Sequence, residues 1–249
     1  MKIAFIVSSS IQVDNQYPLT YSHIRSYFNN EERLRHTVFT INSLERFKDT
    51  STIYLVDTSR ESEYYRKFFS YQANLKYISV HDEFSEIYNE VISHPHKSRC
   101  EGLILNKFMD TYAHELDQYD FIFKISGRYF FDSSFSVDQL EKDKLLFKAH
   151  HSFEWRDEWQ LHYLDLRQSQ LDNTLRQYPS VLFGWDRKFN TIMKNMFLQI
   201  ANTVTEPGKS GSDMETLLYY FTRLYESSII EYNWIVYGWT GTSGQFVRY

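Results

Sequence analysis

Hydrophobic and polar segments alternate along the first half of the chain in the rhythm of an α/β protein. Short runs that are apolar throughout and end in polar residues are typical of strands buried on both faces of a parallel sheet. We predict such strands at residues 3–7, 52–56, 75–80 and 121–125. Segments with helical spacing separate them, at residues 31–47, 62–69, 84–92 and 101–116. The order strand, helix, strand predicts parallel strands joined by right-handed crossovers.

The first of these helices has the clearest amphipathic pattern. Its apolar positions are spaced so that they lie on one face, and an asparagine directly before it, Asn29 or Asn30, is available as the N-cap. The predicted buried face consists of Leu34, Val38, Ile41 and Leu44.

The pattern loosens beyond residue 140. Strands are predicted at residues 145–148, 181–183 and 229–236, and helices at residues 187–200 and 213–225. No internal repeat and no low-complexity linker interrupts the chain, so we expect one domain over residues 1–249. Within it, residues 1–132 are expected to form a nucleotide-binding half and residues 133–249 an acceptor-binding and catalytic half.

Small polar and charged residues follow three of the predicted strands. Because ligands of open α/β sheets bind outside the carboxyl ends of the strands, these residues should meet at one rim. They are Ser8, Ser9, Ser10, Asp57, Ser126, Gly127 and Arg128. The serines could offer hydroxyl and N–H groups to a nucleotide, or be ordinary loop residues. Asp57 could bind a ribose or a base edge, or complete a turn.

Composition narrows the classes of protein. Apolar residues make up 42% and charged residues 24% of the chain, as in globular proteins. A formal net charge of -5 argues against binding nucleic acid through many phosphates. The single cysteine, Cys100, excludes an internal disulfide framework and favours the cytoplasm. The apolar start of the chain is too short for a signal segment or a membrane span, which leaves peripheral membrane contact open.

The most informative stretch is Lys124 to Tyr129, with the sequence Lys-Ile-Ser-Gly-Arg-Tyr. A buried strand delivers a lysine near its end, Gly127 permits close backbone approach or a positive φ, and Arg128 offers a planar fork suited to phosphate oxygens. Two cations at the mouth of a sheet suggest a diphosphate ligand. The alternative is a structural ion pair of these cations with Asp120 or Asp132.

This stretch resembles the Lys-x-x-Gly-Arg-Tyr segment of a group of bacterial and phage glycosyltransferase-like proteins, at the place where typical GT-A enzymes carry a metal-binding Asp-x-Asp. Residues 32–44 are similar to the Glu-Arg, Gln-Thr, Thr-Ile-x-Ser-Ile helix of the group, although His36 stands where glutamine is usual. Lys97 and Glu101 resemble its Lys-x-x-x-Glu element. The resemblance covers the first half of the chain and implies a GT-A-like fold and a nucleotide-sugar donor. The residues expected to contact this donor include Lys97, Glu101, Lys124, Ser126, Gly127 and Tyr129.

Two carboxylates open the predicted helix at residues 213–225. The resemblance implies that the group deprotonating the acceptor hydroxyl lies here, with Glu215 the first choice and Asp213 the second. Acidic residues in a first helical turn are also favoured by capping and by the helix dipole. No Asp-x-Asp follows the strand at 121–125, so we expect a reaction without metal, in which Arg128 and Lys124 stabilise the departing nucleotide.

Aromatic residues make up 18% of the chain, and their faces suit sugar rings and nucleobases as well as a core. Trp155 and Trp185 are candidates for contact with substrate, and Trp155, Trp159 and His162 for an acceptor-binding wall. His150 and His151 invite a metal site, but adjacent residues of a strand point to opposite faces.

The sequence therefore predicts a glycosyltransferase that moves a sugar from a nucleotide-sugar donor to a hydroxyl of a glycan or glycoconjugate, with inversion and without a metal cofactor. One alternative is a non-catalytic glycan- or nucleotide-binding protein of the same fold. Another is a nucleotidyltransferase, although no Gly-rich basic loop follows the first strand.

Overall fold

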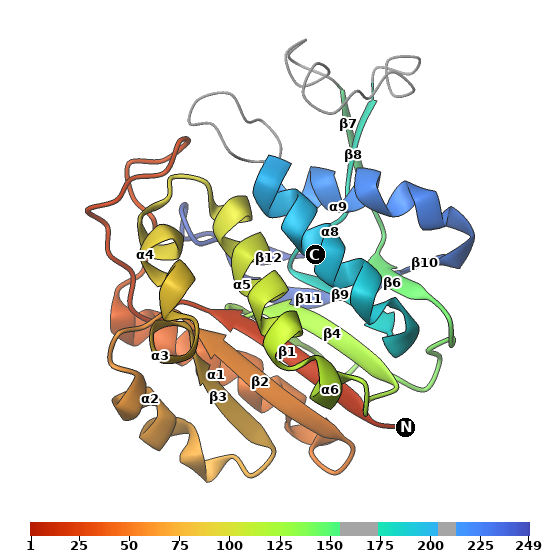
Figure 1. Ribbon diagram of the computed structural model, residues 1–249, viewed down its shortest axis with the longest axis horizontal. Coiled ribbons are helices and arrows are strands. Elements are labelled where there is room, and N and C mark those ends of the chain that lie inside the picture. The colour runs from red at the N-terminus through yellow and green to blue at the C-terminus, as the bar shows by residue number, and fades with distance from the viewer. Residues whose placement is uncertain (155–173, 204–212) are drawn as a thin grey trace.

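The computed structural model describes residues 1–154, 174–203 and 213–249. Its centre is a mostly parallel sheet of seven strands in the order β10-β6-β9-β4-β1-β2-β3, flanked by helices (Figure 1). The strands are β1 (Ile3–Ser9), β2 (Ser51–Asp57), β3 (Leu75–Ser79), β4 (Phe121–Ser126), β5 (Tyr129–Phe131), β6 (Leu145–Lys148), β7 (His151–Glu154), β8 (Thr174–Gln177), β9 (Leu182–Asp186), β10 (Ile229–Tyr232), β11 (Val236–Trp239) and β12 (Phe246–Arg248). The predicted α/β class with a Rossmann-like sheet is confirmed.

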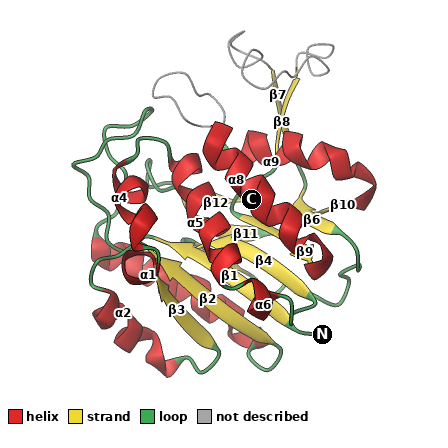
Figure 2. Ribbon diagram, viewed as in Figure 1, coloured by secondary structure: helices red, strands yellow, loops and turns green. Residues whose placement is uncertain are grey.

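Helices lie on both faces of this sheet (Figure 2). The α-helices are α1 (Asn30–Leu44), α2 (Ser62–Phe68), α3 (Val80–Glu83), α4 (Ser85–Ser93), α5 (Lys97–Thr111), α6 (Ala113–Leu116), α8 (Asn190–Thr203) and α9 (Met214–Thr222). Short 3-10 segments are η1 (Glu45–Phe47), η2 (Phe69–Tyr71), η4 (Arg187–Phe189) and η5 (Arg223–Ser228).

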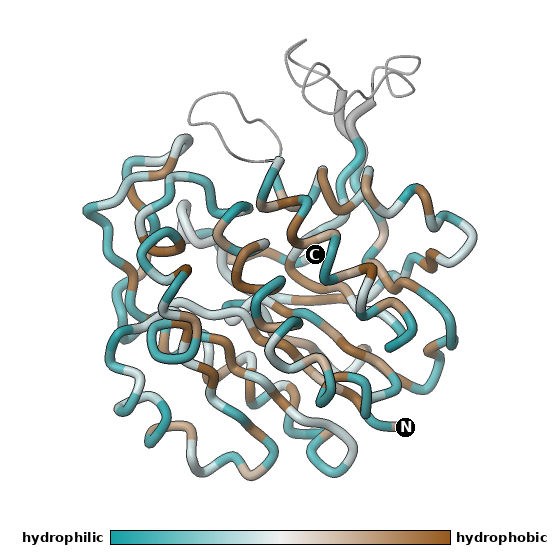
Figure 3. Tube along the Cα trace, in the orientation of Figure 1, coloured by the Kyte–Doolittle hydropathy of each residue, from teal (hydrophilic) through white to brown (hydrophobic). Residues whose placement is uncertain are grey.

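Alternate residues of the inner strands serve two separate hydrophobic cores. In β1, Ala4 and Ile6 join the core under α4, α5, α8 and α9. Ile3, Phe5 and Val7 join the core under α1 and α2. The strands carry the most hydrophobic part of the trace, as Figure 3 shows. Because a strand alternates its side chains, burial on both faces requires the uninterrupted apolar run seen in the sequence.

Strand β9 runs antiparallel to both of its neighbours, β4 and β6, a direction that the sequence pattern does not indicate. One prediction about the second half of the chain is wrong. Residues 229–236 do not form one strand: β10 joins the central sheet, whereas β11 pairs with β5 and β12 in a separate three-stranded sheet. Tyr232, the last residue of β10, and Trp234, which lies before β11, stack with their ring centroids 4.5 Å apart. Aromatic packing therefore continues through the segment that separates the two strands.

Helix α1 is confirmed, but its buried face is rotated from the predicted one. Leu34 and Val38 are only partly buried, whereas Arg33, His36, Thr37 and Thr40 are buried with Ile41 and Leu44. The helix therefore presents polar side chains to the interior. Asn29 caps it in a reciprocal capping box with Glu32, with both hydrogen bonds at 2.9 Å.

This cap gives a matched pair of variants. Replacing Asn29 by alanine should lower the free energy of unfolding by about 1 kcal/mol, since the first turn of α1 loses an acceptor. Replacing the equally exposed neighbour Asn30 should change it by less than about 0.5 kcal/mol. Urea unfolding of both variants measures this, and equal losses would contradict the assignment of the cap.

Candidate functional site

The predicted rim exists at the carboxyl ends of β1, β2 and β4. Ser8 lies opposite Ser126 in the register of β1 and β4, and Ser9 lies opposite Asp57 in the register of β1 and β2. Gly127 continues this close contact, since its N–H donates to the Ser8 carbonyl at 2.7 Å. A Cβ at Gly127 would lie 3.1 Å from both that carbonyl oxygen and the Ser9 Cβ. Close approach therefore explains this glycine, which does not have a positive φ.

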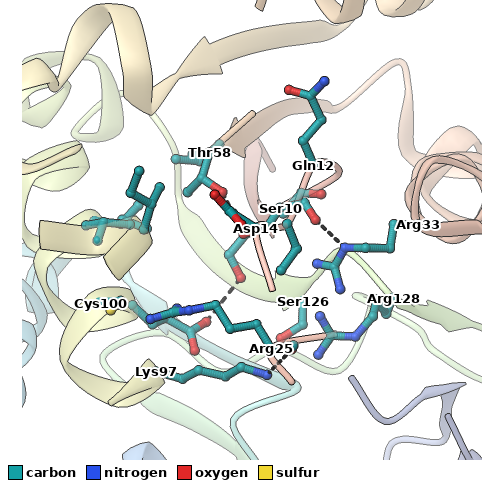
Figure 4. Close-up of a pocket in the computed structure, with 18 residues that line it drawn as sticks. Ser10, Gln12, Asp14, Arg25, Arg33, Thr58, Lys97, Cys100, Ser126 and Arg128 are labelled. Atoms are coloured by element: carbon teal, nitrogen blue, oxygen red, sulfur yellow. Dashed lines mark hydrogen bonds between the residues drawn. The ribbon is translucent and has the colours of Figure 1, made fainter. Parts of the chain in front are cut away.

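A cavity of about 170 Å³ opens at this rim (Figure 4). Its polar lining includes Ser8, Ser9 and Ser10 of β1 and the loop after it, together with Ser126. Apolar side chains, among them those of Val56 and Val91, form another part of the wall. The basic residues that line the cavity are Arg25, Arg33, Lys97 and Arg128.

These four cations converge from distant parts of the chain, and two carboxylates, of Asp14 and Glu101, line the same cavity. Figure 4 shows Arg33, Lys97 and Arg128 pointing toward a common space. Arg33 donates to the Ser10 carbonyl, Lys97 to the Arg25 carbonyl at 2.9 Å, and Arg128 to the Trp239 carbonyl at 3.2 Å. Within the described part of the chain, none of the four forms an ion pair.

The charges of these four side chains repel one another. Burial, and then the positive charges of Arg128, Arg33 and Arg25, lower the pKa of Lys97 to about 7, against the opposing effect of the Glu101 carboxylate. Burial and the charge of Arg128 likewise lower the pKa of Arg33 to about 9. An anion placed in this cavity would relieve the repulsion, so the cavity is suited to phosphate oxygens.

The N-terminus of α5 reinforces this positive potential. Lys97, the first residue of α5, lines the cavity, and Cys100 and Glu101 line it one turn further on. No side chain among the described residues caps this end of the helix. The free N–H groups and the helix dipole therefore favour an anion at the same place.

A larger cavity of about 780 Å³ adjoins the first. Both cavities are lined by Lys97, Glu101, Ser126 and Arg128, which form their shared wall. The larger cavity is also lined by aromatic and polar residues from distant segments. They include Tyr21, His96, Tyr129, His151, Gln177, Ser180 and Tyr249.

The two candidate bases, Glu215 and Asp213, both line the larger cavity, but their carboxylates accept different hydrogen bonds. Asp213 is the N-cap of α9: its Oδ1 accepts from the Thr216 N–H at 2.8 Å and its Oδ2 from Gln177 Nε2 at 2.9 Å. Glu215 accepts a hydrogen bond from the Ser180 hydroxyl. Burial, and then the charge of Asp213, raise the pKa of Glu215 from 4.5 to about 7. Glu215 is thus the better placed of the two to exchange a proton near neutral pH.

Lys124 does not contact either cavity, contrary to the prediction that it faces the nucleotide. It is fully buried, with its ammonium 2.5 Å from Glu101 Oε1, and it donates to the Ser180 carbonyl at 2.7 Å. The expected ion pair exists, but its partner is neither Asp120 nor Asp132. The Glu101 carboxylate is held by this ion pair and by a hydrogen bond from the Ser8 hydroxyl at 3.1 Å, so it has a structural role in the shared wall.

Two other predicted binding residues are structural. The Asp57 carboxylate is fully buried and accepts from the Ile11 N–H at 2.9 Å and the Tyr77 hydroxyl at 2.9 Å, so it fixes the loop after β1. Trp185 is fully buried, and its indole donates to Asn190. It lies opposite Ile122, near the amino end of β4, because β9 runs away from the rim.

Trp155, Trp159 and His162 lie outside the described residues. His150 Nδ1 lies 2.9 Å from Glu231. Across residues 1–154, 174–203 and 213–249, no group of three His, Cys, Asp or Glu side chains is arranged to hold a metal ion.

Sequence reasoning missed Arg25, Arg33 and Ser180 as residues of this site. Arg33 and Thr37 are one turn apart on α1, in line with Ile41 of the core, so a polar stripe on the apolar face was the available signal. Ser180 reaches the rim because β9 is antiparallel and its amino end lies there. Arg25 lies in a loop without periodicity, and nothing in the sequence marks it.

Comparison with known proteins gives no match to a protein-family model and no significant match to a curated protein. In the parts of the chain that the structure describes, no helix combines the length and apolar character needed to cross a membrane.

The raised pKa of Glu215 makes a prediction about stability. As pH rises above 4.5 the unfolded chain releases this proton first, so the native protein loses stability until pH exceeds about 7. Glu215→Gln removes this loss. The difference in unfolding free energy between the variant and the unmodified protein should therefore favour the variant more at pH 8 than at pH 5. Urea unfolding of both proteins at the two pH values measures this.

Glu63→Gln is the control, because Glu63 lies in the first turn of α2 but is exposed. Its effect should be the same at pH 5 and pH 8. A pH-independent effect of Glu215→Gln would contradict the burial of an ionisable carboxylate at this place.

Proposed function

We propose that this protein is a glycosyltransferase that transfers a sugar from a nucleotide-sugar donor to a hydroxyl of a glycan or glycoconjugate acceptor. The observation that carries the proposal is the pair of adjoining cavities. One is lined by four cations that form no ion pair within the described residues, and the other holds a carboxylate with a pKa near 7.

The smaller cavity suits the nucleoside diphosphate part of the donor. Its apolar side chains, such as Val56 and Val91, offer a surface for the base, and the serines after β1 offer hydroxyl groups to the ribose. The diphosphate would lie against Arg33, Lys97 and Arg128. This arrangement leads the sugar past the shared wall into the larger cavity.

The reaction that fits this arrangement is a direct displacement. Glu215 accepts the proton of the acceptor hydroxyl, whose oxygen forms a bond to the anomeric carbon as the bond from that carbon to the phosphate oxygen breaks. The nucleoside diphosphate departs with the bonding electron pair. A single attack opposite the leaving group inverts the configuration of the anomeric carbon.

The cations take part in the departure of the nucleotide. Charge develops on the leaving phosphate oxygen, and fixed positive groups that are already in place stabilise it without reorganisation. Arg128 and Lys97 are the best placed for this role, since both line the two cavities. A Cβ at Gly241 would lie 3.1 Å from Arg128 Nη2, so this glycine leaves room for the guanidinium. We propose that these cations replace a divalent metal.

A thermal-shift panel of UDP, GDP, CMP and dTDP sugars with EDTA present tests donor binding. A donor at about 100 times its Kd should stabilise the protein by roughly 2.7 kcal/mol. Arg128→Ala should weaken binding of that donor by about tenfold or more, because charge-assisted bonds to phosphate are lost. Arg35→Ala is the control, since Arg35 lies on α1 but is exposed and paired with Glu31.

Glu215→Gln separates a transferase from a binding protein. Turnover of the donor that binds should fall by about 10²–10⁴-fold, because the proton acceptor is removed, whereas donor affinity should stay the same. NMR of the product should show an inverted anomeric centre. A protein that binds the donor but transfers nothing would be the non-catalytic alternative, and retention would overturn the role of Glu215.

A further inference from the structure

A continuous chain of polar contacts joins the two cavities through the interior of the protein. The Ser8 hydroxyl, on the wall of the smaller cavity, donates to Glu101 at 3.1 Å. Glu101 pairs with Lys124 at 2.5 Å, and Lys124 donates to the Ser180 carbonyl at 2.7 Å. The Ser180 hydroxyl then donates to Glu215, on the wall of the larger cavity.

The backbone around Ser180 is held from both sides. On one side, the Ser126 N–H at the end of β4 donates to the Val181 carbonyl at 3.1 Å. On the other, the Tyr178 N–H donates to the Glu215 carbonyl at 3.1 Å. Ser180 is itself buried. Its hydroxyl is therefore fixed relative to both the sheet and the first turn of α9.

Lys124 fixes this segment more firmly than backbone contacts alone could. Its buried ammonium has three oxygen partners, of Glu101, Ser126 and Ser180, so displacing the Ser180 carbonyl would leave a buried charge with fewer partners. The position of the Ser180 hydroxyl is thus set by an interaction in the centre of the sheet.

We propose that Ser180, held by Lys124, is a positioning residue that orients the Glu215 carboxylate in the larger cavity and favours its ionised form. This inference rests on the proposed function only in giving Glu215 the role of a base. The contact itself is part of the structure whatever the reaction, since the Ser180 hydroxyl donates to the Glu215 carboxylate.

Other charged groups face Glu215 as well, and the hydroxyl of Ser180 acts against the two carboxylates among them. Asp213, at the start of the same helix, and Glu101, from α5, both favour the protonated carboxyl. The donated hydrogen bond from Ser180 has the opposite effect on the pKa. The remaining titratable groups that line the same cavity are Tyr21, His96, Lys97, Arg128, Tyr129, His151 and Tyr249.

The first test needs no enzymatic activity. Ser180→Ala should cost about tenfold more in the folding equilibrium constant at pH 8 than at pH 5, because the ionised carboxylate needs the donor more than the protonated one does. In the Glu215→Gln background, the cost should be equal at the two pH values. Ser180→Thr, which keeps the hydroxyl, should restore the original behaviour.

Ser51→Ala is the matched control, because Ser51 is a buried serine at the start of β2, at the other end of the sheet. Its cost should not depend on pH. A pH-independent cost of Ser180→Ala, or a pH dependence that persists in the Glu215→Gln background, would overturn the proposal.

The second test uses the transfer reaction. In Ser180→Ala the rate at pH 6 should fall by about tenfold, while the rate at pH 9 should stay within about twofold and the KM for the donor should not change. An unchanged acid limb of the pH profile would overturn the positioning role. If the unmodified protein transfers no sugar, the proposed function fails, and the unfolding experiments still decide whether Ser180 controls Glu215.

Discussion

The ammonium group of Lys124 lies in the central sheet with no exposed surface, and its oxygen partners come from three parts of the chain. Transferring such a charge from water costs several kcal/mol, which is offset only if every partner is in place. Glu101 fixes α5 against β4, and Ser180 fixes the start of β9. The wall between the two cavities therefore depends on a single buried ion pair.

The positive cavity is held in an unfavourable state by the rest of the fold. Arg25 and Arg33 are buried, and their guanidinium groups donate to carbonyl oxygens rather than to carboxylates. These bonds satisfy the donors, and within the described residues neither guanidinium forms an ion pair, so the repulsion between Arg33 and Arg128 remains. Two hydrophobic cores and the paired strands β1, β2 and β4 stabilise a native state that includes this repulsion.

Much of the sheet could be predicted from the sequence, since strands buried on both faces need apolar runs and the parallel order fixes one rim. Ser8, Ser126 and Arg128 were found in this way. The periodicity of the sequence does not indicate strand direction. Because β9 is antiparallel to β4, Trp185 lies at the far end of the sheet and Ser180 lies at the rim. Nor does it distinguish a buried cation that faces a ligand from one, such as Lys124, that is paired in the core.

The mutual repulsion of the cations has a consequence for the proton content of the protein. Because Lys97 has a pKa of about 7, a substantial share of the molecules lack its proton at neutral pH. A bound anion would favour the charged amine, so filling the cavity would draw protons from the solvent. The heat of binding would then include the ionisation enthalpy of the buffer, and the same ligand would give different calorimetric heats in imidazole and in Tris, two buffers that supply no competing phosphate.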